Sequence, residues 1–83
     1  MAQVQIYTTR ICAYCVMAKR LLARLDQEYE EIGVDADHEK RAWLVEATGQ
    51  RTVPQIFIDG QSIGGYQELA ALHQKGELEE LLS

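Results

Sequence analysis

Two cysteines separated by two residues, Cys12 and Cys15, are the part of this sequence best suited to chemistry. They are the only cysteines among the 83 residues, and a bridge between them closes a loop too short to stabilise a fold. A closed zinc site needs four ligands, and His38 and His73 lack the spacing of a zinc-binding pair. The sequence therefore favours a redox-active pair over a structural disulfide or a zinc site.

The elements around the pair decide what each sulfur does. Residues 4–8 alternate and are β-prone, which predicts a strand, and residues 9–12 follow as a short loop. Apolar residues then recur at helical spacing, so a helix is expected directly after Cys12. The N–H groups and positive dipole of a helix N-terminus lower a thiol pKa from about 8.5 into a range of about 3.5 to 7.5. We therefore expect Cys12 to be the attacking thiolate and Cys15, one turn further on, to be the resolving thiol.

The rest of the chain predicts an α/β fold. Further strands are expected at residues 29–34, 52–58 and 61–63, and Asp59-Gly60 is a strong hairpin signal between the last two. Further helical segments are expected from Asp35 or Asp37 to Gly49 and around residues 68–72, with a final turn at 78–82. The order β-α-β-α-β-β-α implies one four-stranded mixed sheet flanked by helices. Its first two strands are parallel and its last two antiparallel, in a single domain of residues 1–83.

The charge is distributed unevenly along the chain. The net charge of −5 argues against nucleic acid as a main partner. Residues 1–25 nevertheless contain four basic and no acidic residues, whereas the remainder contains four basic and 13 acidic residues. A solvated helix face is the ordinary interpretation of Lys19, Arg20 and Arg24. Arg10 differs because it lies two residues before Cys12 and adds to the positive potential there.

The N-terminal residues show neither the basic region nor the long apolar region of a secretory signal, and no segment is apolar enough to span a membrane. We expect a cytoplasmic, monomeric protein with no membrane partner. In that reducing compartment a close cysteine pair indicates redox or metal chemistry more often than structure.

Three stretches, taken in this order and spacing, resemble the signature sequences of the glutaredoxins, and the resemblance covers essentially the whole chain. These stretches are Tyr7-Thr8-x-x-x-Cys12-x-Tyr14-Cys15, Thr52-Val53-Pro54-Gln55-Ile56-Phe57-Ile58 and Gly64-Gly65. The resemblance implies a thioredoxin-like fold and a groove for glutathione between the three stretches. It also implies that glutathione acts as a co-substrate.

Carried over by position, the resemblance assigns parts of the groove to particular residues. Val53, preceded by Thr52, would offer its backbone N–H and C=O to the cysteinyl part of glutathione. Pro54 would be in the cis conformation beside Cys12, although only about 5–6% of X–Pro bonds are cis in general. Tyr14 would flank the ligand.

The other side of the implied groove begins at Gly64-Gly65, where the backbone would approach the ligand. The N–H groups of Tyr66 and Gln67, at the start of a helix, would hold the γ-glutamyl carboxylate. Family members often have an aspartate for the γ-glutamyl amine, and this chain has Gln67 followed by Glu68. Gln67 cannot make a charged contact, so Glu68 is the candidate for the amine.

Two further positions differ from the family pattern. The family usually has lysine where this chain has Thr9, and Arg10 or Arg51 is the candidate to replace it at the glycyl carboxylate. Ala13 stands where proline is common between the cysteines, which restores a backbone N–H near the sulfurs. Relatives with a small residue there sometimes hold a [2Fe–2S] cluster through the first cysteine, here Cys12, and glutathione.

The resemblance implies a glutathione-dependent disulfide oxidoreductase that reduces glutathionylated and disulfide-containing proteins through Cys12 and Cys15. Two alternatives stay open. One is a carrier of a [2Fe–2S] cluster, suggested only by Ala13. The other is an electron donor reduced by thioredoxin reductase, against which Gly64-Gly65 and the implied groove argue.

Overall fold

Four strands form one mixed sheet in the order β2-β1-β3-β4, as seen in the computed structural model, which describes residues 2–83. Met1, part of the predicted domain 1–83, lies outside the described residues. The strands are β1 (Val4–Thr8), β2 (Glu30–Gly33), β3 (Gln55–Ile58) and β4 (Gln61–Gly64). β1 pairs in parallel with β2 and antiparallel with β3, and β3 pairs antiparallel with β4. The predicted four-stranded mixed sheet is confirmed.

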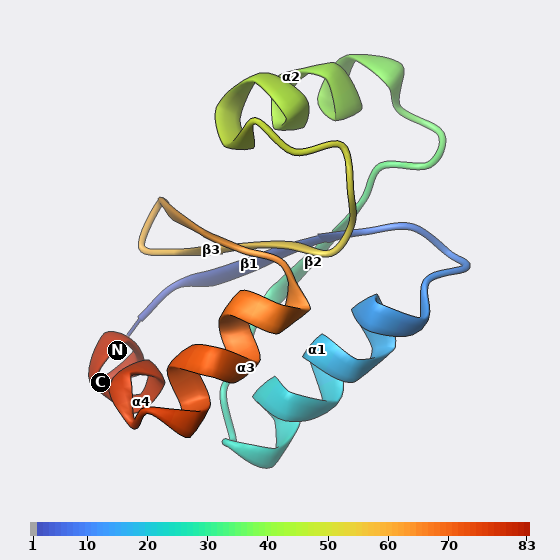
Figure 1. Ribbon diagram of the computed structural model, residues 1–83. Coiled ribbons are helices and arrows are strands. Elements are labelled where there is room, and N and C mark those ends of the chain that lie inside the picture. The colour runs from blue at the N-terminus through green and yellow to red at the C-terminus, as the bar shows by residue number, and fades with distance from the viewer. Residues whose placement is uncertain (1) are drawn as a thin grey trace.

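The helices cover both faces of this sheet (Figure 1). They are α1 (Ala13–Arg24), α2 (His38–Thr48), α3 (Tyr66–Gln74) and α4 (Glu77–Leu82). Figure 1 shows α1, α3 and α4 on one face and α2 on the opposite face. The segment that the sequence indicated as a final turn is therefore a short helix, α4, packed with α1 and α3 through the buried Leu78.

The alternation of apolar residues along the strands explains the two covered faces. Ile6 and Ile56 are fully buried in the core beneath α1, α3 and α4. The next residues along the strands, Tyr7 and Phe57, point to the other face and pack with Leu44 of α2. Each such buried side chain stabilises the fold by about 1.5–3 kcal/mol. Packing on both faces therefore holds the sheet, and with it the loops at the ends of its strands, in place.

The ends of the elements follow local signals in the sequence. Asp37 caps α2 by accepting a hydrogen bond from the Lys40 N–H at 2.9 Å, and Gly49 ends the helix with a left-handed φ of 71°. At the hairpin between β3 and β4, Asp59 and Gly60 have φ values of 51° and 80°. Positive φ at both positions suits the twist of a two-residue hairpin, so the Asp-Gly prediction is confirmed.

The third strand is shorter than predicted. It begins at Gln55, whereas the sequence indicated a strand from residue 52. Residues 52–54 instead form a loop that reaches Cys12, and the Val53–Pro54 peptide bond in it is cis, as the resemblance implied. Proline has no N–H to donate to a sheet, so it suits the residue just before the strand.

Candidate active site

Cys12 is the N-cap of α1. Its backbone is extended, with φ −156°, and its Sγ accepts a hydrogen bond from the Cys15 N–H at 3.1 Å. An N–H aimed at this sulfur stabilises a thiolate more than a thiol, because hydrogen bonds to an ion are the stronger ones. The helix therefore supplies the electrostatic environment that the sequence predicted for Cys12.

The two cysteines differ in how far solvent reaches them. Cys12 is half-buried, whereas Cys15, one turn into α1, is only 1% exposed. A disulfide joins the two residues, whose Cα atoms are 5.2 Å apart. An incoming disulfide can therefore meet Cys12 first, and Cys15 can reach only what is already attached to Cys12. This geometry fits the predicted roles of the two sulfurs.

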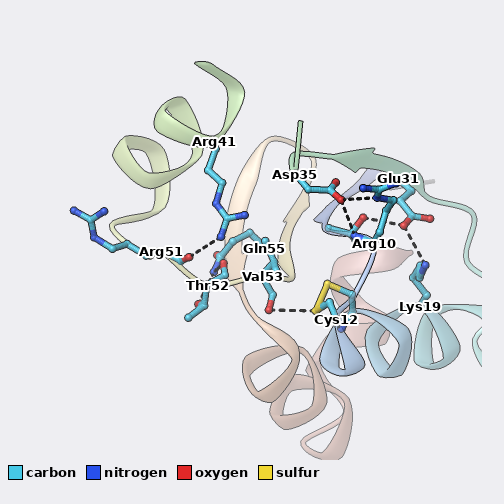
Figure 2. Close-up of a disulfide and its surroundings, with 12 residues drawn as sticks. Arg10, Cys12, Lys19, Glu31, Asp35, Arg41, Arg51, Thr52, Val53 and Gln55 are labelled. Carbon is cyan, nitrogen blue, oxygen red and sulfur yellow. Dashed lines mark hydrogen bonds and ion pairs between the residues drawn. A yellow bond between two sulfur atoms is a disulfide. The ribbon is translucent and has the colours of Figure 1, made fainter. Parts of the chain in front are cut away.

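The cis-proline loop lies directly against the sulfur of Cys12. Cys12 Sγ is 3.6 Å from the carbonyl oxygen of Val53, and Figure 2 shows this contact beside the yellow disulfide. Pro54 is buried, whereas Thr52 is exposed and Val53 half-buried. The backbone of Val53 thus borders the reacting sulfur with its polar groups.

A groove of about 290 Å³ opens between α1, this loop and the start of α3. Eight of its lining residues are ones that the resemblance assigned to glutathione, and the ninth is Gln50. The lining residues are Tyr14, Gln50, Thr52, Val53, Pro54, Gly65, Tyr66, Gln67 and Glu68. Segments far apart in the sequence therefore meet in one groove, which includes Val53, the residue in contact with the Cys12 sulfur.

The α3 end of the groove is shaped by two glycines. Gly64 has a φ of 116°, and a Cβ there would lie 2.9 Å from Cγ of Glu68. A Cβ at Gly65 would lie 3.3 Å from the carbonyl oxygen of Pro54. Glycine at position 65 therefore lets the start of α3 approach the cis-proline loop, and glycine at position 64 leaves room for the Glu68 side chain.

Glu68 fixes the first turn of α3. Its carboxylate accepts a hydrogen bond from the Gly65 N–H at 2.7 Å, in a capping arrangement. Tyr66 and Gln67 are the first two residues of α3, so their N–H groups have no acceptor within the helix. These two N–H groups and the helix dipole make this end of the groove suited to a carboxylate.

Two tyrosines form one wall of the groove. The rings of Tyr14 and Tyr66 stack with their centroids 6.2 Å apart and an angle of 27° between their planes. Tyr14 comes from α1 and Tyr66 from α3, so the pair joins the two helices that border the groove. The side chain of Tyr14, 55% exposed, remains available to a ligand.

Arg10 lies outside this groove. Its backbone N–H and its Nε both donate to the carboxylate of Asp35, at 3.2 and 3.1 Å, as Figure 2 shows. The backbone hydrogen bond from Arg10 is the main cause that lowers the pKa of Asp35. This pairing ties the loop before Cys12 to the segment after β2.

Arg51 also points away from the cysteines. Its carbonyl oxygen accepts a hydrogen bond from Nη2 of Arg41 at 3.3 Å, and Figure 2 shows its guanidinium turned away from Cys12. The structure therefore does not bring Arg10 or Arg51 together with the eight groove residues. A role for either of them at the glycyl carboxylate stays a prediction.

Lys19 is paired as well. Its Nζ lies 3.0 Å from the carboxylate of Glu31, which also accepts a hydrogen bond from the Thr8 hydroxyl at 2.8 Å. The Thr8 hydroxyl first, and then Lys19, lower the pKa of Glu31 despite some opposing effect of burial. Like Arg10, this basic residue of the positive N-terminal stretch is thus paired with a carboxylate.

The sequence interpretation missed Gln50 and the pairing role of Asp35. Gln50 lies in the irregular segment after α2, where no periodic pattern indicates which side chains face the groove. Asp35 looked like a possible helix cap, but Asp37 took that role, so its partner depended on tertiary structure. No local signal would have identified either contact.

Among residues 2–83, no three or more His, Cys, Asp or Glu side chains gather in a way that could hold a metal ion. No helix in the same part of the chain is long and apolar enough to cross a membrane.

Comparison with known proteins points to one family. A family model for glutaredoxin matches residues 4–63. Glutaredoxin 3 of Escherichia coli (strain K12) is 45% identical over 82 residues, which cover 99% of both chains. A glutaredoxin of Pseudomonas aeruginosa is 46% identical and covers all of this chain and 99% of its own.

Solved structures agree with these sequence matches. The solution structure of glutaredoxin from Brucella melitensis has a TM-score of 0.89 and 46% identity, covering 99% of this chain and 89% of that one. A crystal structure of a buckwheat glutaredoxin–glutathione complex has a TM-score of 0.90 and 33% identity, covering 98% and 76%. The similarity extends over both the fold and the length of the chain.

Proposed function

Since this chain belongs to the glutaredoxin family of thiol–disulfide oxidoreductases, we propose that it reduces glutathione mixed disulfides and protein disulfides with glutathione as the electron donor. The observation that carries the proposal is the groove beside Cys12, with the N-terminus of α3 at one end. A buckwheat relative with the same fold has been solved as a complex with glutathione.

The groove residues divide the recognition of glutathione between them. The backbone N–H and C=O of Val53 pair with the cysteinyl part, which brings the glutathione sulfur to Cys12. The N–H groups of Tyr66 and Gln67 hold the γ-glutamyl carboxylate at the positive end of α3. The carboxylate of Glu68 lies next to them and takes the γ-glutamyl amine.

Thr52 and Tyr14 border the ligand from the loop and from α1, and Pro54 forms the floor between them. The glycyl carboxylate has no basic partner inside the groove. Arg51 is our candidate for that contact because it stands between Gln50 and Thr52, both of which line the groove. A rotation of its exposed side chain would turn the guanidinium toward the ligand, whereas Arg10 is held by Asp35.

The reaction on a glutathionylated protein proceeds in two exchanges. The Cys12 thiolate attacks the glutathione sulfur, the mixed disulfide breaks, and the target protein leaves as a thiolate that takes up a proton. Cys12 is then joined to glutathione. A second glutathione thiolate attacks that bond, which releases glutathione disulfide and regenerates the Cys12 thiolate.

Protein disulfides require the second cysteine. Cys12 attacks one sulfur of the target, and the thiolate of Cys15 then attacks Cys12 and releases the target in its reduced form. The product on the enzyme is the Cys12–Cys15 disulfide, which is the bond that the structure contains. Two glutathione molecules then return it to the dithiol and leave as glutathione disulfide.

A glutathionylated peptide assay tests the proposal. With glutathione and glutathione reductase present, the wild type should release the peptide, Cys12→Ser should be inactive, and Cys15→Ser should retain this activity but lose reduction of a peptide disulfide. Full peptide release by Cys12→Ser would contradict the assigned roles. A wild type that turns over with thioredoxin reductase but not with glutathione would overturn the glutathione dependence.

A further inference from the structure

A second hollow lies on α1, next to the glutathione groove but separate from it. It has a volume of about 500 Å³ and is lined by Met17, Arg20, Ala23, Arg24 and Tyr66. We call it the α1 groove. Tyr66 also lines the glutathione groove, so the two hollows meet at this one side chain. Figure 1 shows α1 and α3, which supply these residues, side by side on the same face of the sheet.

The α1 groove carries two positive side chains. Arg20 and Arg24 are exposed, and within residues 2–83 neither forms an ion pair, whereas the neighbouring Lys19 is paired with Glu31. A basic residue in the last turn of a helix is favourable for the helix itself, which accounts for Arg24 but not for Arg20. The chain carries a net charge of −5, so these two arginines, four residues apart and outside any of those ion pairs, form a local positive site on an acidic protein.

The first turns of α1 and the loop before it expose apolar side chains, of which Met17 lines the α1 groove. Met17 and Val16 are 41% and 42% exposed, and Ile11, just before Cys12, is 98% exposed. Together with Tyr14 they are four of the six large hydrophobic residues that are most exposed on the described surface. An exposed apolar surface beside a reactive residue indicates a contact with another molecule, and methionine adapts to contacts of varied shape.

We propose that the α1 groove docks the acidic flank of an extended segment of a protein substrate whose disulfide is attacked by Cys12. The inference rests on the proposed function and extends it to the choice of protein substrates. Met17 and Tyr66 offer apolar contacts, and Arg20 and Arg24 pair with glutamate or aspartate through their forked donors. Glutathione itself is recognised elsewhere, so this surface serves the target polypeptide.

The helix spacing predicts where the acidic residues of the target stand. Arg20 and Arg24 follow Cys12 by eight and twelve residues, which is about 12 and about 18 Å along a helix axis at about 1.5 Å per residue. An extended target advances about 3.3 Å per residue. Acidic residues about four to six positions from the attacked cysteine would therefore reach the two arginines.

Three peptides with one internal disulfide and matched composition provide the test. One has glutamates four and five positions before the disulfide, one has them after it, and one has glutamines at these positions. With glutathione as the reductant at low ionic strength, we expect at least one glutamate peptide to be reduced about three- to tenfold faster than the glutamine peptide. High salt should remove the advantage because these charges are exposed.

Charge variants locate the effect. The preference for glutamate should disappear in the Arg20→Glu/Arg24→Glu variant and decrease in the milder Arg20→Gln/Arg24→Gln variant, which protects the test against misfolding of the first. The Lys40→Glu/Lys75→Glu variant changes the net charge equally on other surfaces and should keep the preference. Loss of the preference in that control would show an effect of total charge and overturn the proposal.

The remaining outcomes separate this inference from the function on which it rests. Equal rates for all three peptides in the wild type would overturn the docking proposal but leave the function intact. Failure to reduce even the glutamine peptide with glutathione would instead contradict the proposed function. Sedimentation that shows a wild-type dimer, dissociated by Arg20→Glu/Arg24→Glu, would assign the groove to a second copy and likewise overturn the proposal.

Discussion

Glu68 has two roles in our account, and substitutions can separate them. Its carboxylate caps the start of α3 through the Gly65 N–H at 2.7 Å, and we propose that it also takes the γ-glutamyl amine of glutathione. Glu68→Ala removes both interactions. Glu68→Gln keeps an oxygen that can accept the Gly65 N–H but removes the charge that an ammonium group requires. The two variants should therefore affect stability and affinity differently.

The expected magnitudes follow from the exposure of the site. Loss of an exposed cap costs about 1 kcal/mol, which lowers the melting temperature of a domain of this size by about 4–8 °C. An exposed ion pair with the ligand amine contributes at most about 1 kcal/mol, or roughly a fivefold change in KM for a glutathionylated substrate. Glu68→Ala should show both changes, and Glu68→Gln should show only the second.

Thermal unfolding followed by circular dichroism, together with steady-state kinetics on a glutathionylated peptide, measures both quantities. A des-amino glutathione, which lacks the γ-glutamyl amine, provides the matched control, because the wild type and Glu68→Gln should bind it equally. If Glu68→Gln has the wild-type KM for ordinary glutathione substrates, Glu68 is only a helix cap. If it melts as low as Glu68→Ala, the capping argument is wrong.

Two further predictions concern stability. The Thr8 hydroxyl and Lys19 lower the pKa of Glu31, so this carboxylate stabilises the fold above its usual pKa of 4.5, and the contribution is lost as the pH falls through its lowered folded value. Urea denaturation should therefore show a weaker acid dependence for Glu31→Gln than for the wild type, and equal dependence would contradict the pairing. Gly64→Ala should lower the free energy of unfolding by about 1–3 kcal/mol, because its φ is 116° and the new Cβ would meet a side chain at 2.9 Å. Gly60→Ala, with a φ of 80° and no atom within 4 Å of its Cβ, separates the two causes: equal losses would leave no role for the contact.

Much of the fold could be predicted because its signals are local. The Asp59-Gly60 turn, the cap at Asp37 and the helix that begins after Cys12 each depend on a few neighbouring residues. The alternation of apolar residues then determines which face of each strand is buried. The start of β3 was harder to place, because Thr52 and Val53 are β-prone although Pro54, which has no N–H for the sheet, follows them.

The site could be predicted where a resemblance supplied the missing tertiary information. Neither the composition nor the spacing of residues indicates that Tyr66 would stack on Tyr14, since 52 positions separate them. The long flexible side chains were the least predictable. Arg10 and Arg51 both stand close to groove residues in the sequence, but side-chain conformation places both guanidinium groups elsewhere.

The positive charge near the cysteines also depends on side-chain contacts that the sequence does not predict. Four basic residues surround the cysteine pair in the sequence, but two of them are paired in the structure. Glu31 of β2 pairs with Lys19, and Asp35, after β2, pairs with Arg10. The backbone at the start of α1 offers a donor of another kind, because the N–H of Cys15 points at the Cys12 sulfur from 3.1 Å. A backbone donor neither titrates nor pairs with a competing carboxylate, so the support it offers to the proposed Cys12 thiolate does not depend on a nearby cation. Arg20 and Arg24, being too far along α1 to act on the sulfur, remain available to a partner.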